Sequence, residues 1–365
     1  VVHTAICLSL IGGVIVGVIG VLASRSLLIL MRVPQDSVLP LSALYLRIYF
    51  AGMPFNLLYN FGSSLCRARG DSRTPLLFLL AAGVSNLGLN IFFVAVCKMD
   101  VAGVALGTVI AQMISSTLVL AHLMRTKGHC RVRLRALRIH RDALGDILRI
   151  GLPAGVQGCI FSFSNVIIQS SINSFGEAAI TANAEAANIA GFVYTSMNAV
   201  SQACLTFTGQ NYGAKKAKNM DVVLADSLLI VVCMGLALGL GVYFSGGLLM
   251  RIYTKSDEVV RLGVDRMGVI CTTYFLCGVM EVLVGSLRGM GHSVLPMAVS
   301  VVGVCGLRIV YIFTVFAYCN TPFVPYLSYP VSWTLTILAH AVSLFFARKK
   351  EHRRLSELSS AAPQA

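Results

Sequence analysis

Long apolar runs separated by short polar segments follow one another along almost the whole chain, as at residues 76–96 and 222–244. A helix needs about 20 apolar residues to cross the hydrocarbon core of a bilayer, whereas the strands of a membrane barrel alternate apolar and polar residues. The pattern therefore predicts an all-α membrane protein with about ten spanning helices, at residues 3–24, 42–65, 75–96, 102–124, 148–174, 178–208, 222–245, 262–286, 294–316 and 327–347.

Composition and charge agree with this prediction. Hydrophobic residues make up 56% of the chain and charged residues 12%, against roughly 25% charged residues in an average soluble domain. The net charge is +14, but the basic residues gather in alternate loops, as the positive-inside rule expects of a cytoplasmic face. We therefore expect a lipid bilayer as partner and no nucleic acid. The expected location is a bacterial cytoplasmic membrane, with segments 66–74, 125–147, 209–221 and 287–293 and the C-terminus inside.

The sequence contains an internal repeat with an offset of 221 residues. The offset places Arg67, Gly70, Ser72 and Pro75 on Arg288, Gly291, Ser293 and Pro296. An even number of helices per repeat makes the two copies parallel. The helices at 148–174 and 178–208 have no partner, because the matching positions lie before Val1. We therefore predict two bundles of four and six helices from a parent of six plus six: an incomplete N-lobe (1–124), a basic linker (125–147), a C-lobe (148–347) and a tail (348–365).

Four short motifs carry a resemblance to a known family. They are Arg67-Ala-Arg-Gly-Asp71 followed by Pro75, Leu287-Arg-Gly-Met-Gly291 followed by Pro296, Gly151-Leu-Pro153, and Gly209-Gln-Asn-Tyr-Gly-Ala214. In this order, within a duplicated frame, they resemble the multidrug and toxic compound extrusion (MATE) transporters, and most closely the DinF-like branch. The resemblance implies two six-helix lobes, alternating access, and efflux of organic cations in exchange for H⁺ or Na⁺.

The chain departs from the pattern of the sodium-linked members of that family. Where the resemblance implies two acidic residues, this sequence has Phe161 and Cys277. The resemblance therefore favours H⁺ over Na⁺ as the coupling ion.

Glu281 is the strongest candidate for a shared proton and cation site. A charge at membrane depth costs about 2.5–3.5 kcal/mol on insertion scales, so a carboxylate there requires an explanation. Spacings of three and four place Tyr274, Cys277 and Glu281 on one helix face, and the repeat places Met53, Asn56 and Asn60 on the matching face of the other lobe. Burial favours the neutral carboxyl, which suits a site shared by a proton and a cation. The alternative is a structural acid held by a tyrosine or by the backbone.

Glu185 is the second candidate acid. It lies on one stripe of its helix with Asn188 and Gln202. Counting from the helix ends puts Glu185 and Arg308 at the same depth. A structural ion pair between them is therefore as well supported as a cation site.

The remaining polar residues have two interpretations each. Gln157 and Asn165 on the fifth helix either form interhelical hydrogen bonds or line a polar cavity. Asp71 with its neighbouring arginines, Arg67 among them, forms a loop salt-bridge cluster or a gate, and Arg288 occupies the repeated position in the other loop.

These observations predict a monomeric secondary antiporter that exports amphipathic cations. The alternative is a flippase for lipid-linked sugars, which would need several cavity arginines. No H-E-x-x-H or G-x-S-x-G segment occurs, so we do not expect an enzyme. The eleven cysteines form no C-x-x-C pair, so we expect neither a metal nor a cofactor.

Overall fold

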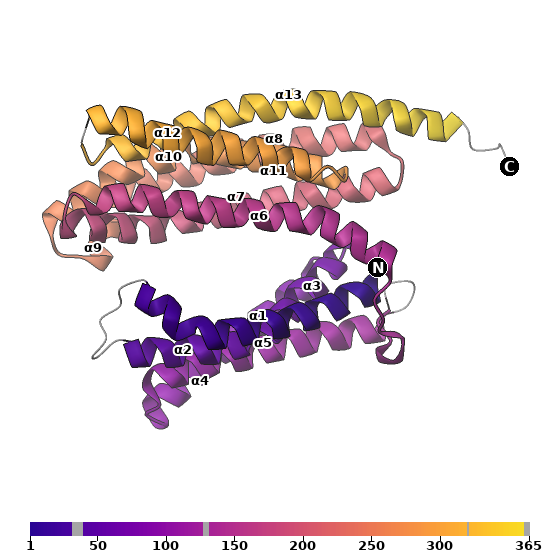
Figure 1. Ribbon diagram of the computed structural model, residues 1–365, viewed down its shortest axis with the longest axis horizontal. Coiled ribbons are helices and arrows are strands. Elements are labelled where there is room, and N and C mark those ends of the chain that lie inside the picture. Colours follow the sequence, from indigo (N-terminus) through magenta and orange to yellow (C-terminus); the bar gives the residue numbers. More distant parts are fainter. Residues whose placement is uncertain (31–38, 127–130, 320, 361–365) are drawn as a thin grey trace. The chain divides into compact units, whose positions relative to one another are not determined.

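The computed structural model describes residues 1–30, 39–126, 131–319 and 321–360 of the chain. Helices are the regular secondary structure throughout these residues (Figure 1). Among them, eight helical segments are long and apolar enough to cross a membrane: Val2–Ile29, Arg73–Val96, Asp100–Arg125, Arg141–Asn173, Ala217–Phe244, Asp257–Gly289, Val294–Phe316 and Val324–Arg354. The predicted all-α membrane class is therefore confirmed.

Two of the predicted spans are not among these eight. The span at 42–65 is divided at Gly52 into α2 (Leu39–Ala51) and α3 (Met53–Ala68). Pro54, which has no N–H to donate, lies in the first turn after the break. The span at 178–208 forms α7 (Glu177–Gly213), which is long but carries many polar side chains. The count of about ten spans and the division into four and six stay predictions.

Contacts divide the chain into two compact units, Val1–Ile147 and Leu148–Ala365. In the first unit, α1 (Val2–Leu30) packs on α2 and α3, and α5 (Asp100–Arg125) packs on α2, α3 and α4 (Arg73–Ile91). After α4 the chain continues as the π-helical segment η1 (Phe92–Val96), and η2 (Leu134–Ala136) is a short turn in the basic segment. The core contains Ile6, Leu58, Cys66, Val119 and Leu123.

The second unit is built around α10 (Asp257–Gly289), which packs on α7, α8 (Ala217–Phe244) and α13 (Val324–Ser360). Its other elements are α6 (Arg141–Asn173), most of which belongs to this unit, α9 (Gly246–Tyr253), α11 (Val294–Ser300), η3 (Val301–Gly306), α12 (Leu307–Tyr311) and η4 (Ile312–Phe316). Small residues allow the close approach of the central helices, because a β-carbon at Gly285 of α10 would lie 2.9 Å from the carbonyl oxygen of Ser201 in α7.

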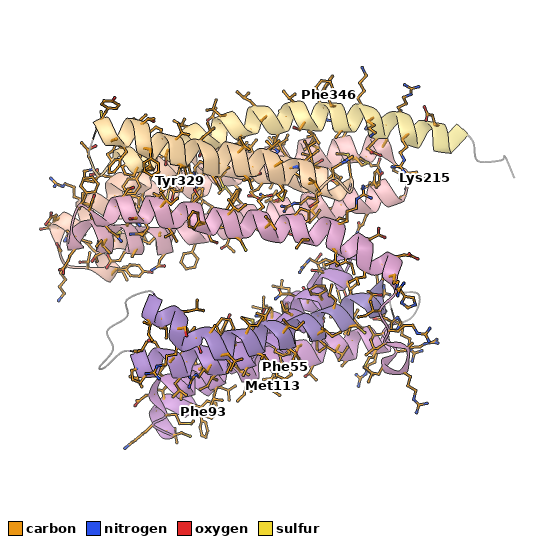
Figure 2. The ribbon with its side chains drawn as sticks, in the orientation of Figure 1. Phe55, Phe93, Met113, Lys215, Tyr329 and Phe346 are labelled. Atoms are coloured by element: carbon orange, nitrogen blue, oxygen red, sulfur yellow. The ribbon has the colours of Figure 1, made fainter. Side chains whose placement is uncertain are left out.

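Large apolar side chains cover the outside of the helices. Phe313, Leu338 and Phe346 are each at least 60% exposed, and Phe346 projects away from α13 (Figure 2). In water such a surface would be unfavourable, whereas in a bilayer it contacts acyl chains. The exposed apolar surface therefore agrees with a lipid environment.

The two loop motifs related by the 221-residue offset have the same backbone conformation. Gly70 and Gly291 have φ values of +93° and +85°, a region that favours glycine because it has no β-carbon. Gly70 donates to the carbonyl of Arg67 at 2.8 Å, and Gly291 donates to the carbonyl of Arg288 at 2.9 Å. The spans that follow these turns, Arg73–Val96 and Val294–Phe316, both end in a π-helical segment, η1 and η4. The sequence repeat therefore corresponds to a repeat in local structure.

Candidate functional site

A cavity of about 390 Å³ lies within the second unit. Three of its lining residues, Tyr274, Cys277 and Glu281, share one face of α10 because they are three and four residues apart. Met280 of α10 also lines the cavity, and the other lining residues come from α6, α7, η3, α12 and α13: Gly158, Phe161, Ser162, Asn165, Tyr194, Val304, Arg308, Tyr329 and Trp333. The structure therefore places Asn165 and Arg308, which were predicted separately, around one cavity with the predicted pair Glu281 and Tyr274.

Glu281 is the acidic residue of this cavity lining. Its backbone carbonyl accepts a hydrogen bond from the Ser201 hydroxyl at 2.8 Å, which fixes this turn of α10 against α7. Within the described part of the chain, its carboxylate has neither a hydrogen bond nor an ion pair. The nearby tyrosines of the lining do not donate to it. The carboxylate is thus positioned by its helix and left available to the cavity.

Arg308 is the basic residue of the lining and is only 5% exposed. Its Nε donates to the Ser332 hydroxyl at 3.0 Å, and its Nη1 donates to the Asn165 side-chain oxygen at 3.5 Å. The guanidinium also lies over the ring of Tyr329, 4.1 Å from the centroid. Neutral oxygens and an aromatic face therefore hold this cation.

The alternative of an ion pair between Arg308 and Glu185 is wrong. Over the described residues, Arg308 has the neutral partners given above, and Oε2 of Glu185 is buried without a hydrogen-bond partner. Residues 301–306 form the π-helical segment η3 immediately before α12. Counting residues from the helix ends gives depth alone, and it does not specify toward which neighbouring helix a side chain points.

A chain of four aromatic rings lines the cavity. Tyr194 lies 6.2 Å from Tyr274, Tyr274 is stacked on Trp333 at 5.5 Å, and Trp333 meets Tyr329 edge-on at 5.6 Å. Only Tyr274 was predicted, because aromatic residues in apolar helices are also common as lipid-facing groups. The signal that could have found the others is the four-residue spacing of Tyr329 and Trp333, which places them on one helix face, together with Trp333 being the single tryptophan of the chain.

Two other predicted residues of the second unit form interhelical hydrogen bonds. Gln157 is 4% exposed and accepts a hydrogen bond from Nη2 of Arg288 at 2.8 Å, which links α6 to α10. Asn165 links α6 to α12 through Arg308. Asn188 and Gln202 are exposed on the surface of this unit and do not line the cavity.

The predicted residues of the first unit form a local polar group on α3. The Asn60 side-chain amide donates to the side-chain oxygen of Asn56 at 3.0 Å and to its backbone carbonyl at 2.9 Å. Met53 is half-buried on the same helix. Their placement opposite Glu281 stays a prediction.

The Asp71 carboxylate has different partners from the predicted arginine cluster. It accepts a hydrogen bond from the backbone N–H of Thr74 at 3.0 Å and lies 3.4 Å from Nε2 of His122 on α5. These interactions, with the Thr74 hydrogen bond first, hold the pKa of Asp71 below its usual range. Arg67 instead donates to the hydroxyls of Ser63 and Ser64. The Asp71 salt-bridge cluster with its neighbouring arginines is therefore wrong.

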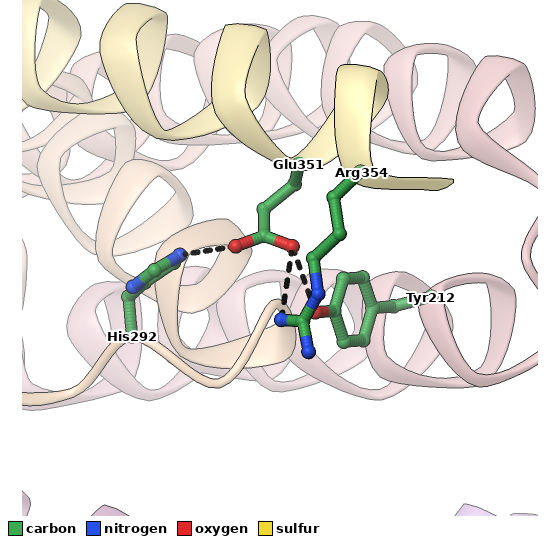
Figure 3. A network of polar contacts seen from close by, with 4 residues as sticks. All are labelled: Tyr212, His292, Glu351 and Arg354. Atoms are coloured by element: carbon green, nitrogen blue, oxygen red, sulfur yellow. Dashed lines mark hydrogen bonds and ion pairs between the residues drawn. The ribbon is translucent and has the colours of Figure 1, made fainter. Parts of the chain in front are cut away.

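In the second unit, the sequence analysis missed a network of polar contacts beside the loop motif that contains Gly291 (Figure 3). Glu351 of α13 is 3% exposed. It accepts a hydrogen bond from the Tyr212 hydroxyl at 2.8 Å, contacts Nε2 of His292 at 3.2 Å and pairs with Arg354 at 3.8 Å. Burial raises the pKa of Tyr212, and the carboxylate that accepts its hydrogen bond raises it further. The network ties α13 to the end of α7 and to the turn after α10.

Comparison with known proteins identifies the family. The MatE family profile matches residues 1–96 and 153–314. The chain is 25% identical to "Probable multidrug resistance protein YoeA" of Bacillus subtilis, over 97% of this chain and 78% of that protein. It is 29% identical to "Probable multidrug resistance protein YpnP" of the same organism, over 80% of this chain and 65% of that protein.

Solved structures agree with this fold. A mutant of the Vibrio cholerae MATE transporter VcmN superimposes with a TM-score of 0.83 at 20% identity, covering 96% of this chain and 78% of that one. Family members are transporters rather than enzymes, and they act on small molecules in a lipid membrane. The relatives given above are bacterial proteins. The chain therefore belongs to the MatE family of multidrug efflux transporters, as its loop motifs predicted.

Proposed function

We propose that this protein is a secondary antiporter that exports amphipathic cations in exchange for protons by alternating access. In this proposal the cavity of the second unit is the shared site, and Glu281 is the group that a proton and a cationic substrate occupy in turn. The C-terminus faces the cytoplasm, and the protein acts as a monomer. The flippase alternative is not favoured, because this cavity has one arginine and a pyrophosphate would need several.

The observation that carries the proposal is the Glu281 carboxylate, which borders the cavity with neither a hydrogen bond nor an ion pair among the described residues, Arg288 being the charged side chain that acts on it. An ionised carboxylate in an apolar environment is unfavourable unless a positive charge compensates it. A bound proton or a bound organic cation satisfies this requirement equally well, but the two cannot share the carboxylate at once. Such mutual exclusion is the physical basis of exchange.

The lining of the cavity supports protons rather than Na⁺ as the coupling ion. Alkali and alkaline-earth ions prefer several oxygen ligands. Phe161 and Cys277, which occupy the positions of the two family acids, both lie in the cavity wall. The cavity thus offers one carboxylate, which is sufficient for a proton.

Transport by reconstituted vesicles tests the proposal. Efflux of a fluorescent cation should follow an imposed pH gradient and should not respond to a Na⁺ gradient at constant pH. One pH unit corresponds to about 1.36 kcal/mol, so electroneutral exchange should support about a tenfold concentration ratio of a monovalent substrate. Transport that requires Na⁺ at constant pH would overturn proton coupling, and no gradient-driven transport of any cation would overturn the antiporter itself.

A further inference from the structure

A second hollow of the second unit, with a volume of about 520 Å³, lies between α8 and α13. We call it the α8–α13 groove. Its lining residues are Asp221 of α8 and four residues of α13, Phe345, Arg348, Lys349 and His352. The apolar run of α13 ends just before Arg348. In a membrane-spanning α13 the groove therefore lies where the hydrocarbon core meets the polar surface of the bilayer.

The charges in the α8–α13 groove do not balance. Asp221 forms an ion pair with Arg348 and lies 3.3 Å from Nε2 of His352. Lys349 is exposed and has no acidic partner among the residues that the structure describes. The contacts of Asp221 are sufficient to hold α8 and α13 together at this end. They do not explain Lys349, which remains available to an anion from outside the protein.

One face of α13 connects these charges to the apolar surface of the protein. Spacings of four and three residues place Leu338, Val342, Phe345, Lys349 and His352 on this face. The three apolar residues are 60%, 58% and 65% exposed, and the two basic residues line the groove together with Phe345. An exposed apolar track along α13 therefore leads directly to a basic end.

This arrangement matches the chemistry of a phospholipid with an anionic headgroup. Basic pockets between helices at the membrane surface bind such headgroups, and a guanidinium can form two parallel hydrogen bonds with a phosphate. The apolar track would contact an acyl chain of the same molecule. A free phosphate ion would use the charges of the groove but would gain nothing from the track.

We infer that the α8–α13 groove binds an anionic phospholipid, with its phosphate at Arg348 and Lys349 and an acyl chain along Phe345 and Val342. Asp221 then competes with the phosphate for Arg348. The inference goes beyond the proposed function, because it depends neither on Glu281 nor on the coupling ion.

Two lipids with identical acyl chains test the inference. The dissociation constants of phosphatidylglycerol and phosphatidylcholine are measured by native mass spectrometry of the purified protein in detergent. We expect phosphatidylglycerol to bind about fivefold more tightly, as for one basic residue at an anionic membrane surface. Equal affinities would overturn the inference. Glycerophosphoglycerol, the same headgroup without acyl chains, should not displace the lipid, and displacement at equal concentration would assign the groove to a soluble anion instead.

Two adjacent lysines locate the headgroup. Lys349→Gln should abolish the preference for phosphatidylglycerol. Lys350→Gln is the matched control and should retain it, because Lys350 is also exposed but does not line the groove. Equal losses in the two variants would show attraction to the general surface charge and would overturn the site.

Two adjacent phenylalanines locate the acyl chain. Phe345→Ala should weaken binding of both lipids by the same factor. Phe346→Ala is the matched control, because Phe346 is equally exposed at 65% but lies outside the groove lining (Figure 2). Equal losses in these two variants would exclude the track along α13.

Asp221→Asn should give a result that a purely structural role of Asp221 would not. Loss of the carboxylate releases Arg348 from its ion pair, so binding of phosphatidylglycerol should become about fivefold tighter, with no change for phosphatidylcholine. Unchanged or weaker binding of phosphatidylglycerol would overturn the inference. If Asp221→Asn does not fold, the comparison of Lys349→Gln with Lys350→Gln decides.

Discussion

Each of the two units joins its loop-motif turn to a long helix by a contact between a histidine and a carboxylate, but with the residue types exchanged. In the first unit the turn after α3 supplies Asp71 and α5 supplies His122, at 3.4 Å. In the second unit the turn after α10 supplies His292, which is Asp71 shifted by 221 residues, and α13 supplies Glu351, at 3.2 Å. Each pair joins the turn at the loop motif to the last long helix of its unit.

The environments of the two pairs differ much more than their geometry. The side chains of Asp71 and His122 are both 33% exposed. Glu351 is 3% exposed and has partners on three separate segments, Tyr212, His292 and Arg354. The two units therefore contain a similar contact whose contribution to stability differs, because solvent screens the exposed Asp71 carboxylate more than the buried Glu351 carboxylate.

Removal of the buried acid should have the largest effect on stability. Glu351→Ala removes the charged acceptor of the Tyr212 hydrogen bond and the carboxylate that His292 contacts, and it should lower the free energy of unfolding by about 2 kcal/mol. Asp71→Ala should cost about 1 kcal/mol. Thermal unfolding of the purified protein in detergent measures both, with Glu357→Ala, an exposed acid on the same helix, as the control. Equal losses for Glu351→Ala and Asp71→Ala would contradict the comparison.

Double-mutant cycles should show an intermediate effect. The coupling free energy between His292 and Glu351, measured with alanine variants, should be about 1–2 kcal/mol because one partner is buried. The coupling between His122 and Asp71 should be about 0.5 kcal/mol or less. Raising the ionic strength should reduce the second value more than the first. A larger coupling in the first unit would reverse the conclusion.

The smallest effect should be the pH dependence that Asp71 confers. Its pKa is lowered in the folded protein, chiefly by the Thr74 hydrogen bond. A lowered folded-state pKa stabilises the protein above the unfolded-state pKa, and this contribution disappears as the pH falls through the folded-state pKa. Asp71→Asn should therefore reduce stability by less than about 1 kcal/mol at pH 7, with the difference fading below about pH 4. A constant difference at all pH values would exclude this carboxylate as the cause.

Much of the fold follows from the sequence because lipid imposes strict conditions on the backbone. Apolar length determines where helices cross, so eight of the predicted spans recur as long helices. The break at Gly52 was missed because the apolar pattern continues through it. The glycines of the two loop motifs, Gly70 and Gly291, mark turns that require positive φ, which is why the repeat could be recognised from the turn residues.

For the candidate site, the sequence predicts only which residues of one helix share a face. Tyr274, Cys277 and Glu281 lie together because helical spacing alone determines their common face. The contributions of other helices depend on packing angles and on local π-helical turns, which the sequence pattern does not specify. Arg308 of α12 and Tyr194 of α7 are two such contributions. The wrong pairing of Arg308 with Glu185 arose because residue counts specify the depth of a side chain and not the direction in which it points.

The central claim is that a proton and a cation compete for the Glu281 carboxylate. Proton release on binding tests it most directly: the methyl ester of tetramethylrhodamine is added to the purified protein in weakly buffered detergent solution, and the released protons are counted with a pH indicator. Below the pH at which Glu281 ionises, the wild-type protein should release close to one proton per bound cation. Glu281→Gln should release none at matched occupancy. Undiminished proton release from Glu281→Gln would contradict the account and assign the exchange to another group.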